Sequence, residues 1–169
     1  MDKAETSQTK GNPIYFYGHT KGDYGCFSQF YPCEFTENGI TYQCAEQYMM
    51  AGKAKTMGDF ETLEKIMVAP RAQDAKKLGR SVTPYDNDKW SAARFDVVKQ
   101  GNLLKFGQNK PLLDILRSTE NRPLVEASPS DTIWGIGISE KDAKRGMSWR
   151  GQNLLGKALM DVREELTLS

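Results

Sequence analysis

The alternation of hydrophobic and polar positions predicts a short sheet at the N-terminal end, followed by a series of helices. Ile14–Tyr17 is aromatic and β-branched, a composition typical of a strand. Glu34–Thr36 and Ile40–Tyr42 flank Asn38 and Gly39, the residue pair that favours a tight hairpin turn. Two further short strands are expected, at Leu124–Ala127 and Thr132–Trp134.

Residues at helical spacing predict the rest of the fold. Leu155, Leu159, Val162 and Leu166 follow the i, i+4, i+7, i+11 pattern of a helix with one face in the core. Helices are expected at about 43–55, 59–68, 70–79, 88–107, 111–118 and 153–166, with Gly79 ending the third and a long, glycine-punctuated connection at 135–151. The fold class is therefore α+β: a helix-rich domain with a small antiparallel sheet.

Length and composition indicate one domain. A chain of 169 residues can bury roughly 70% of its unfolded surface. Residues 1–12 are polar and predict a disordered tail, which leaves 13–169 as a single folded domain. No stretch approaches the 18 apolar residues of a membrane span, and the first residues do not resemble a signal peptide. We expect a cytoplasmic protein, with a nuclear location left open and no indication of an oligomeric state.

Charge and cysteine content narrow the function classes. The net charge is only +1, from 23 basic and 22 acidic side chains, which argues against a strongly basic duplex-binding surface. Cys26, Cys33 and Cys44 are odd in number and lack CxxC spacing, so we expect free thiols in a reducing compartment.

The chain contains a single histidine, His19, in a segment expected to be a loop. This excludes His-based zinc sites and leaves acid–base chemistry mainly to carboxylates, lysine or tyrosine. A cysteine nucleophile paired with a histidine would have to use His19. The sequence shows no metal-ligand pattern, and we expect no metal and no cofactor.

A helix at about 43–55 is the first candidate for chemistry. Glu46 and Lys53 are seven residues apart, so their directions on the helix differ by about 20° and they lie about 10 Å apart along its axis. Met50 lies between them on the same line. Such a pair could address two parts of one ligand, while the alternative is two solvated surface charges.

The segment from Glu126 to Gly135 is the second candidate. It places Glu126 and Asp131 beside Trp134 at the end of an expected strand, and paired carboxylates suit glycosidic bond cleavage. The alternative is a turn in which Ser128 and Asp131 bond their own backbone.

The third candidate is the loop that leads into the last helix. Gly151 and Asn153 precede the helix start, where free N–H groups and the helix dipole favour an anion such as phosphate, and Arg150 could add a charged contact. The alternative is an ordinary helix cap at Asn153.

An ordered set of short motifs spanning about residues 14–166 resembles the NADAR (YbiA-like) domain family. The motifs are Phe16–Gly18, Phe27–Tyr31, Ala45–Tyr48 with Lys53, Leu78–Arg80, Trp90, Lys105–Phe106, Leu124–Ser128, Asp131, Trp134–Gly137 and Gly151–Met160. The resemblance implies an N-glycosidase that acts on ribose attached to a nitrogen base. Two substrate classes are implied: ADP-ribose on guanine in DNA or RNA, and early intermediates of riboflavin biosynthesis.

The resemblance also assigns site residues. Glu46, Lys53, Glu126 and Asp131 would be catalytic, and the substrate-binding set would be Trp90, Trp134, Gly135, Ser28, Phe30, Arg80, Gly151 and Asn153. Gln47 and Gln29 depart from the residues found in many members, which have histidine and asparagine there.

These assignments combine with the residue patterns into a mechanism. Lys53 would attack C1 of the ribose and form a Schiff-base adduct, and Glu46 would handle protons or hold hydroxyl groups. Asp131 or Glu126 would stabilise the cationic transition state or activate water. In a rival, dissociative mechanism Lys53 acts only as a charge. The alternative from another function class is a reader, a non-catalytic module that binds ADP-ribose or a related nucleotide without cleaving it.

Overall fold

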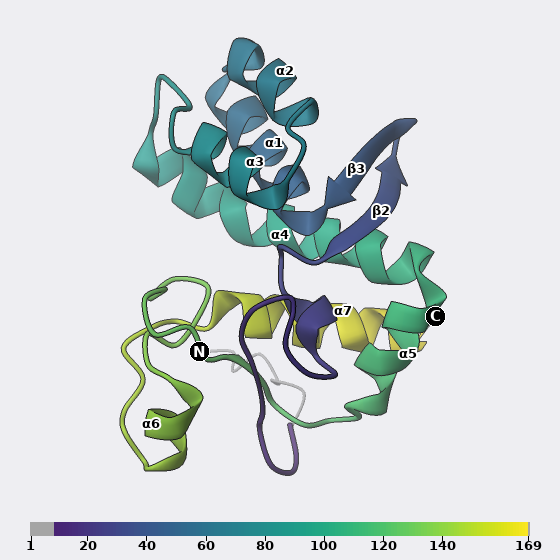
Figure 1. Ribbon diagram of the computed structural model, residues 1–169, viewed down its shortest axis with the longest axis vertical. Coiled ribbons are helices and arrows are strands. Elements are labelled where there is room, and N and C mark those ends of the chain that lie inside the picture. The colour runs from purple at the N-terminus through teal and green to yellow at the C-terminus, as the bar shows by residue number, and fades with distance from the viewer. Residues whose placement is uncertain (1–8, 169) are drawn as a thin grey trace, which may run out of the picture.

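The computed structural model describes residues 9–168, in which helices gather above and below the long helix α4 (Figure 1). The elements, in chain order, are β1 (Ile14–Phe16), a 3-10 turn (Gly25–Phe27), β2 (Pro32–Glu37), β3 (Ile40–Cys44), α1 (Ala45–Met57), α2 (Phe60–Met67), α3 (Ala72–Gly79), α4 (Asn87–Gln108), α5 (Lys110–Ser118), β4 (Leu124–Glu126), α6 (Glu140–Lys144) and α7 (Leu154–Leu168).

Helix α1 forms the centre of the upper part. It packs against α2, α3 and α4, and most of its side chains are therefore buried. Cys44 begins the helix, with its Sγ accepting the Gln47 N–H at 3.4 Å. Gly58 ends it at φ +73°, a left-handed conformation that glycine adopts without steric cost.

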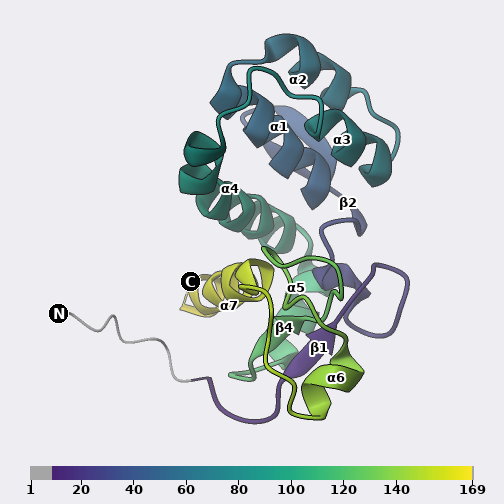
Figure 2. The ribbon, with the colours of Figure 1, turned by 90° about the vertical axis from the view of Figure 1, so that its left-hand side faces the viewer.

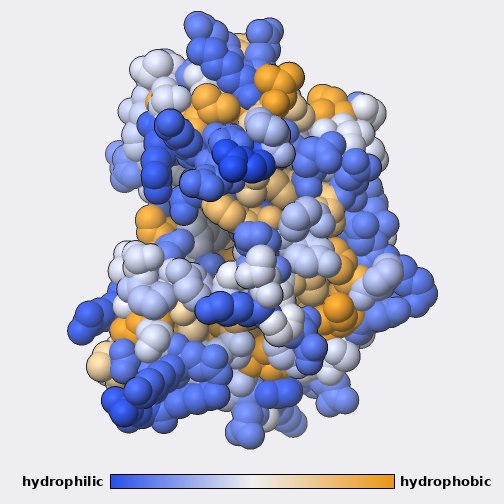
Figure 3. All heavy atoms as spheres, in the orientation of Figure 1, coloured by the Kyte–Doolittle hydropathy of each residue, from blue (hydrophilic) through white to orange (hydrophobic). Residues whose placement is uncertain are grey.

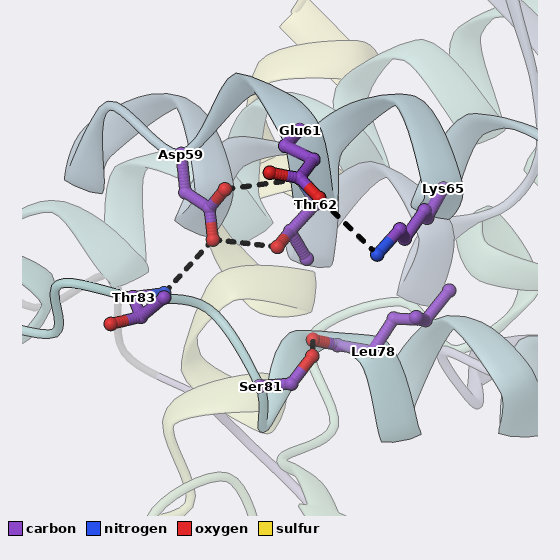
Figure 4. Close-up of polar contacts among 7 residues, drawn as sticks. All are labelled: Asp59, Glu61, Thr62, Lys65, Leu78, Ser81 and Thr83. Atoms are coloured by element: carbon purple, nitrogen blue, oxygen red, sulfur yellow. Dashed lines mark hydrogen bonds and ion pairs between the residues drawn. The ribbon is translucent and has the colours of Figure 1, made fainter.

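The position of α3 depends on a carboxylate at the start of α2. Asp59 accepts hydrogen bonds from the Thr62 N–H and hydroxyl, which caps α2, and from the Thr83 N–H at 2.9 Å (Figure 4). Ser81 donates to the Leu78 carbonyl at the end of α3. Thr83 lies in the connection between α3 and α4. The Asp59 carboxylate therefore links the start of α2 to the segment that joins α3 and α4.

The lower part is built around α7, which packs on β4 and on α4 (Figure 2). Strands β1 and β4 pair in parallel, with Phe16 opposite Glu126. Helix α4 contacts both α1 and α7 and so connects the two parts. The core is continuous through it, with Val98 and Phe106 of α4 fully buried between them.

The expected α+β class and the hairpin are confirmed, but the sheet is not a single antiparallel one. Strands β2 and β3 pair antiparallel as predicted, whereas β1 and β4 form a separate parallel pair. A parallel pair requires a long crossover connection, and here the connection contains the hairpin and α1–α5.

The strand expected at 132–134 is wrong. The carbonyls of Thr132, Ile133 and Trp134 accept the N–H groups of Gln152, Leu154 and Leu155 at 2.9–3.1 Å. This segment therefore satisfies the backbone at the start of α7 instead of pairing with a strand. Its β-branched and aromatic composition could not distinguish these two outcomes.

Two smaller expectations also need correction. Gly79 is the last residue of α3, with Arg80 as its cap, and a Cβ at Gly79 would overlap Met50 Sδ. Its function is close helix packing, not a left-handed helix end. The connection at 135–151 contains α6.

The expected tail at 1–12 falls mostly outside the described residues. Its described end is held in place, because the Lys10 N–H bonds the Asn121 carbonyl and the Asn12 carbonyl accepts from Arg122. Within residues 9–168, no helix combines the length and apolar character needed to cross a bilayer.

Candidate active site

A cavity of about 240 Å³ lies between the two parts of the fold, where the surface in Figure 3 is hollowed. All but three of the predicted site residues line it. They are joined by Gln29, Met49, Met50, Lys76 and Leu155. Larger hollows exist elsewhere on the molecule, but this one contains the clustered carboxylates and amines.

Glu46 lies in the first turn of α1 and is 6% exposed. Burial raises the pKa of its carboxyl group to about 7, since a buried charge loses its hydration. Lys76 is the strongest influence in the opposite direction, and Asp131 adds to the increase. Glu46 can therefore exchange protons near neutral pH.

Lys53 is half-buried two turns further along α1, on the same cavity. Burial lowers the pKa of its amine, Arg80 lowers it further, and Glu46 opposes the change. Its Nζ lies 5.0 Å from the centre of the Tyr85 ring. Glu46 and Lys53 thus face one space, as the helix spacing predicts.

Glu126 reaches the cavity from the end of β4. Burial raises the pKa of its carboxyl group to about 8, and the charges of Asp131 and Glu46 add to the effect. Its Oε2 atom is buried and has no hydrogen-bond partner among residues 9–168. An unpaired buried carboxyl oxygen is costly, which favours the protonated form.

Asp131 satisfies both interpretations of its segment, because it forms a local turn and also lines the cavity. Its Oδ1 accepts the Ile133 and Trp134 N–H groups at 2.9 and 2.8 Å, and its own N–H donates to Ser128 Oγ. The residue therefore forms the expected local turn and also lines the cavity. The turn fixes the orientation of its carboxyl group.

Helix α3 supplies two cations, Lys76 and Arg80, at i, i+4 spacing on the cavity side. Lys76 Nζ lies 5.5 Å from the centre of the Phe30 ring. Sequence reasoning identified Arg80 and missed Lys76, although this spacing was available as a signal. Together with Lys53 they place three cations against three carboxyl groups.

Comparison with known proteins identifies the family. Residues 15–167 match the NADAR domain. The chain belongs to the NADAR domain family. It is 45% identical over 161 residues to N-glycosidase R617 of Acanthamoeba polyphaga mimivirus, covering 90% of this chain and 95% of that protein. It is 32% identical over 153 residues to N-glycosidase Npun_R5314 of Nostoc punctiforme, covering 90% and 92% of the two chains.

One solved structure agrees with this NADAR fold. The NMR structure of the Escherichia coli protein YbiA superposes with a TM-score of 0.77 at 28% identity, over 93% of this chain and 86% of that one. A third relative, riboflavin biosynthesis protein VVA0006 of Vibrio vulnificus, is 34% identical over 154 residues. These residues span 91% of this chain but only 38% of that longer protein.

The phosphate site expected at the start of the last helix is not available in this NADAR domain. The N–H groups of Gln152, Asn153, Leu154 and Leu155 already bond backbone carbonyls. Gly151 packs against Gly135, where a Cβ would overlap the Gly135 carbonyl. These N–H groups therefore have no free hydrogen for an anion.

Asn153 has a structural contact instead. Its Oδ1 accepts the Glu126 N–H and its Nδ2 donates to the Leu124 carbonyl, both at 3.0 Å. It is buried in a left-handed conformation at φ +54°. Asn153 thus holds the end of β4, and Gly135 and Gly151 allow the backbone segments beside it to pack closely.

The departure at Gln47 does not affect the cavity. Its side chain accepts the Gln43 N–H and donates to the carbonyls of Ile66 and Met67. It therefore connects α1 to the end of α2 and points away from Glu46. Position 47 therefore contributes no side chain to the cavity beside Glu46.

Lys105 supports the cavity from below. It is fully buried on α4, and its Nζ donates to the Ser28 carbonyl at 3.0 Å, which holds the loop that carries Ser28 and Phe30. Cys26, Cys33 and Cys44 are free thiols, as expected. Across residues 9–168, His, Cys, Asp and Glu form no group of three or more that could hold a metal ion.

Proposed function

We propose that this protein removes ADP-ribose from guanine bases by hydrolysing the ribose–base N-glycosidic bond. Its relatives make the chain a hydrolase of N-glycosyl compounds. The observation that supports ADP-ribosyl-guanine as the substrate is the cavity itself, in which three carboxyl groups face three cations. Carboxyl groups suit the cleavage of a glycosidic bond, and cations suit a substrate with a pyrophosphate.

Lys53 is the nucleophile in this proposal. Its lowered pKa increases the fraction of neutral amine, the form with a lone pair. The amine nitrogen bonds to C1 of the ribose while the bond from C1 to the base nitrogen breaks. Loss of the amine proton and opening of the ribose ring give a Schiff base. Water then hydrolyses it, releasing ADP-ribose and restoring Lys53.

The carboxyl groups divide the proton transfers. Glu126, with a pKa of about 8, is protonated at neutral pH and donates to the departing base. Glu46, with a pKa of about 7, takes up through water the proton that the attacking amine loses, since the two side chains make no direct contact. Asp131, oriented by two backbone N–H groups, stabilises the positive charge that develops on the ribose.

The other residues that line the cavity bind the phosphates and the base of the substrate. Lys76 and Arg80 hold the phosphates, because they are exposed cations at the edge of the cavity. Trp90 and Trp134 provide flat surfaces on which guanine can stack, a contact worth about 1–3 kcal/mol per base.

The decisive experiment uses ADP-ribosylated guanosine with and without borohydride. We expect release of free ADP-ribose and guanosine, and a reduced adduct on Lys53 in the peptide map. Lys53→Arg keeps the charge and should give neither. Turnover without any Lys53 adduct would support the dissociative mechanism, in which Lys53 acts only as a charge.

Early riboflavin intermediates are the second candidate substrate. The cavity volume of about 240 Å³ lies below the roughly 300–1,000 Å³ of sites that enclose larger ligands, which favours a ribosylated base smaller than ADP-ribosyl-guanine. The name of the Vibrio vulnificus relative, a riboflavin biosynthesis protein, also supports this candidate substrate. Parallel assays with both substrates separate the candidates. Product from neither, with ADP-ribose still bound, would instead indicate a reader.

A further inference from the structure

A second hollow, of about 850 Å³, lies between α6 and the loop that follows β1. We call it the α6 groove and define it by Tyr15, Tyr17, Lys21, Tyr24, Lys141 and Arg145. None of these residues contributes to the cavity described above. Deep blue, hydrophilic side chains gather over α6 on the face shown in Figure 3, the face on which the surface is hollowed.

The charge of the groove is unbalanced. Lys21, Lys141 and Arg145 form no salt bridge with any residue in the described part of the chain. Lys144 is paired with Glu140 at 2.6 Å, which leaves Asp23 as the remaining acid of the lining. In a chain of net charge +1, this is a local concentration of positive charge.

Aromatic rings accompany these cations. Tyr15, Tyr17 and Tyr24 all line the groove, and Tyr17 is 51% exposed. An exposed ring of this size gains from a flat partner, because stacking removes its face from water. Cations interleaved with aromatic rings are the combination that binds single-stranded nucleic acid without sequence preference.

The groove adjoins the catalytic cavity through two shared segments. Along one segment, Glu126 and Asp131 line the cavity, whereas Ala127 and Pro129 line the groove. Along the other, Tyr24 lines the groove and Ser28 lines the cavity. The cavity and the groove therefore share two stretches of the chain as walls.

We propose that the α6 groove binds the single-stranded nucleic acid that flanks the modified guanine, while the cavity cleaves the glycosidic bond. This inference rests on the proposed function. A single strand fits better than a duplex, because a base inside the cavity must leave the helical stack. The strand backbone lies along Lys21, Lys141 and Arg145, and a neighbouring base stacks on Tyr17.

The test compares ADP-ribosylated guanosine with a single-stranded oligonucleotide that carries one ADP-ribosylated guanine. We expect a lower KM for the oligonucleotide than for the nucleoside. Because about three phosphates are neutralised, log KM for the oligonucleotide plotted against the logarithm of the salt concentration should rise with a slope of about 2. Lys141→Gln and Arg145→Gln should each raise the oligonucleotide KM about 3–10-fold and reduce the slope by about 0.7. Both should leave the KM for the nucleoside unchanged.

Two controls separate this proposal from the proposed function. Lys65→Gln removes a cation from α2, at the opposite end of the molecule in Figure 1, and should change neither KM. Fluorescence anisotropy with an unmodified single strand measures groove binding without catalysis. Binding that Lys141→Gln and Tyr17→Ala weaken would support the groove even if neither substrate were cleaved.

Three results would overturn the inference. Equal KM values for nucleoside and oligonucleotide, with variants that behave like the wild type, would remove the groove from substrate binding and leave the proposed function intact. Tighter binding of duplex than of single strand would contradict the stacking argument. Binding of an acidic peptide to the groove, with no binding of the oligonucleotide, would make the groove a protein-docking surface.

Discussion

The carboxyl groups of Glu46 and Glu126 share one cavity, and the charge of Glu46 helps to raise the pKa of Glu126 to about 8. The two residues come from different parts of the fold, one from the start of α1 and the other from the end of β4. Two acids with separated pKa values can serve as base and acid in the same pH range.

The first prediction concerns pH. Glu46 must lose its proton to act as the base, so kcat/KM should rise as the pH passes about 7. Glu126 must keep its proton to act as the acid, so kcat/KM should fall above about 8. The profile should be a bell with its maximum between these values. In Glu126→Gln the remaining activity should lack the alkaline decrease, and an unchanged decrease would assign that limb to another group.

The second prediction concerns the acid on α1. Glu46→Gln preserves shape and removes proton transfer, which is worth about 10²–10⁴-fold in rate. We expect kcat to fall by that factor while the protein stays folded. Glu61→Gln is the matched control, since Glu61 is an exposed glutamate on the neighbouring helix. A Glu46→Gln enzyme with near-normal kcat would exclude Glu46 from the mechanism.

The third prediction concerns stability. The folded state holds a proton on Glu126 up to about pH 8, whereas the unfolded chain releases it near its ordinary pKa of about 4.3. Between these values the folded state binds more protons, so this residue lowers the free energy of unfolding as pH rises.

Glu126→Gln should therefore match the wild type near pH 5 and be about 1–3 kcal/mol more stable at pH 9. Urea unfolding at both pH values measures the difference. A constant difference at both would show that titration of Glu126 is not its source.

The fourth prediction separates the structural contact of Asn153 from phosphate binding. Asn153→Ala removes two hydrogen bonds to β4 and leaves the Glu126 N–H and the Leu124 carbonyl unpaired. We expect a loss of about 2–4 kcal/mol in the free energy of unfolding. Gln152→Ala, at an exposed neighbouring position, should cost far less. A stable Asn153→Ala protein that binds phosphate weakly would restore the original interpretation.

The elements that the sequence predicted correctly are those that depend on interactions between residues close together in the chain. The helices, the Asn-Gly hairpin and the common face of Glu46 and Lys53 depend on periodicity and turn chemistry, which the sequence displays. The sequence pattern also singled out Glu126 and Asp131 as a separate candidate, and family resemblance then assigned them to the same site as Glu46, which lies far from them along the chain. No periodicity could have placed them on the same cavity.

Non-local contacts explain the errors. The carbonyls of 132–134 bond the start of α7 and not a strand, and Gly79 is small because Met50 packs against it. The parallel pairing of β1 with β4 depends on how the intervening helices return the chain. Each outcome depends on a partner distant in sequence.

Helix α4 packs against both α1 and α7, yet the cavity walls come from both parts of the fold. A ligand in the cavity would therefore add a further connection between the two parts. Binding at 100 times the dissociation constant contributes about 2.7 kcal/mol to the free energy of unfolding. Substrate analogues should thus raise the melting temperature and slow amide hydrogen exchange in α1 and α7 together. A melting-temperature screen of ribosylated compounds could consequently find ligands before any turnover assay exists.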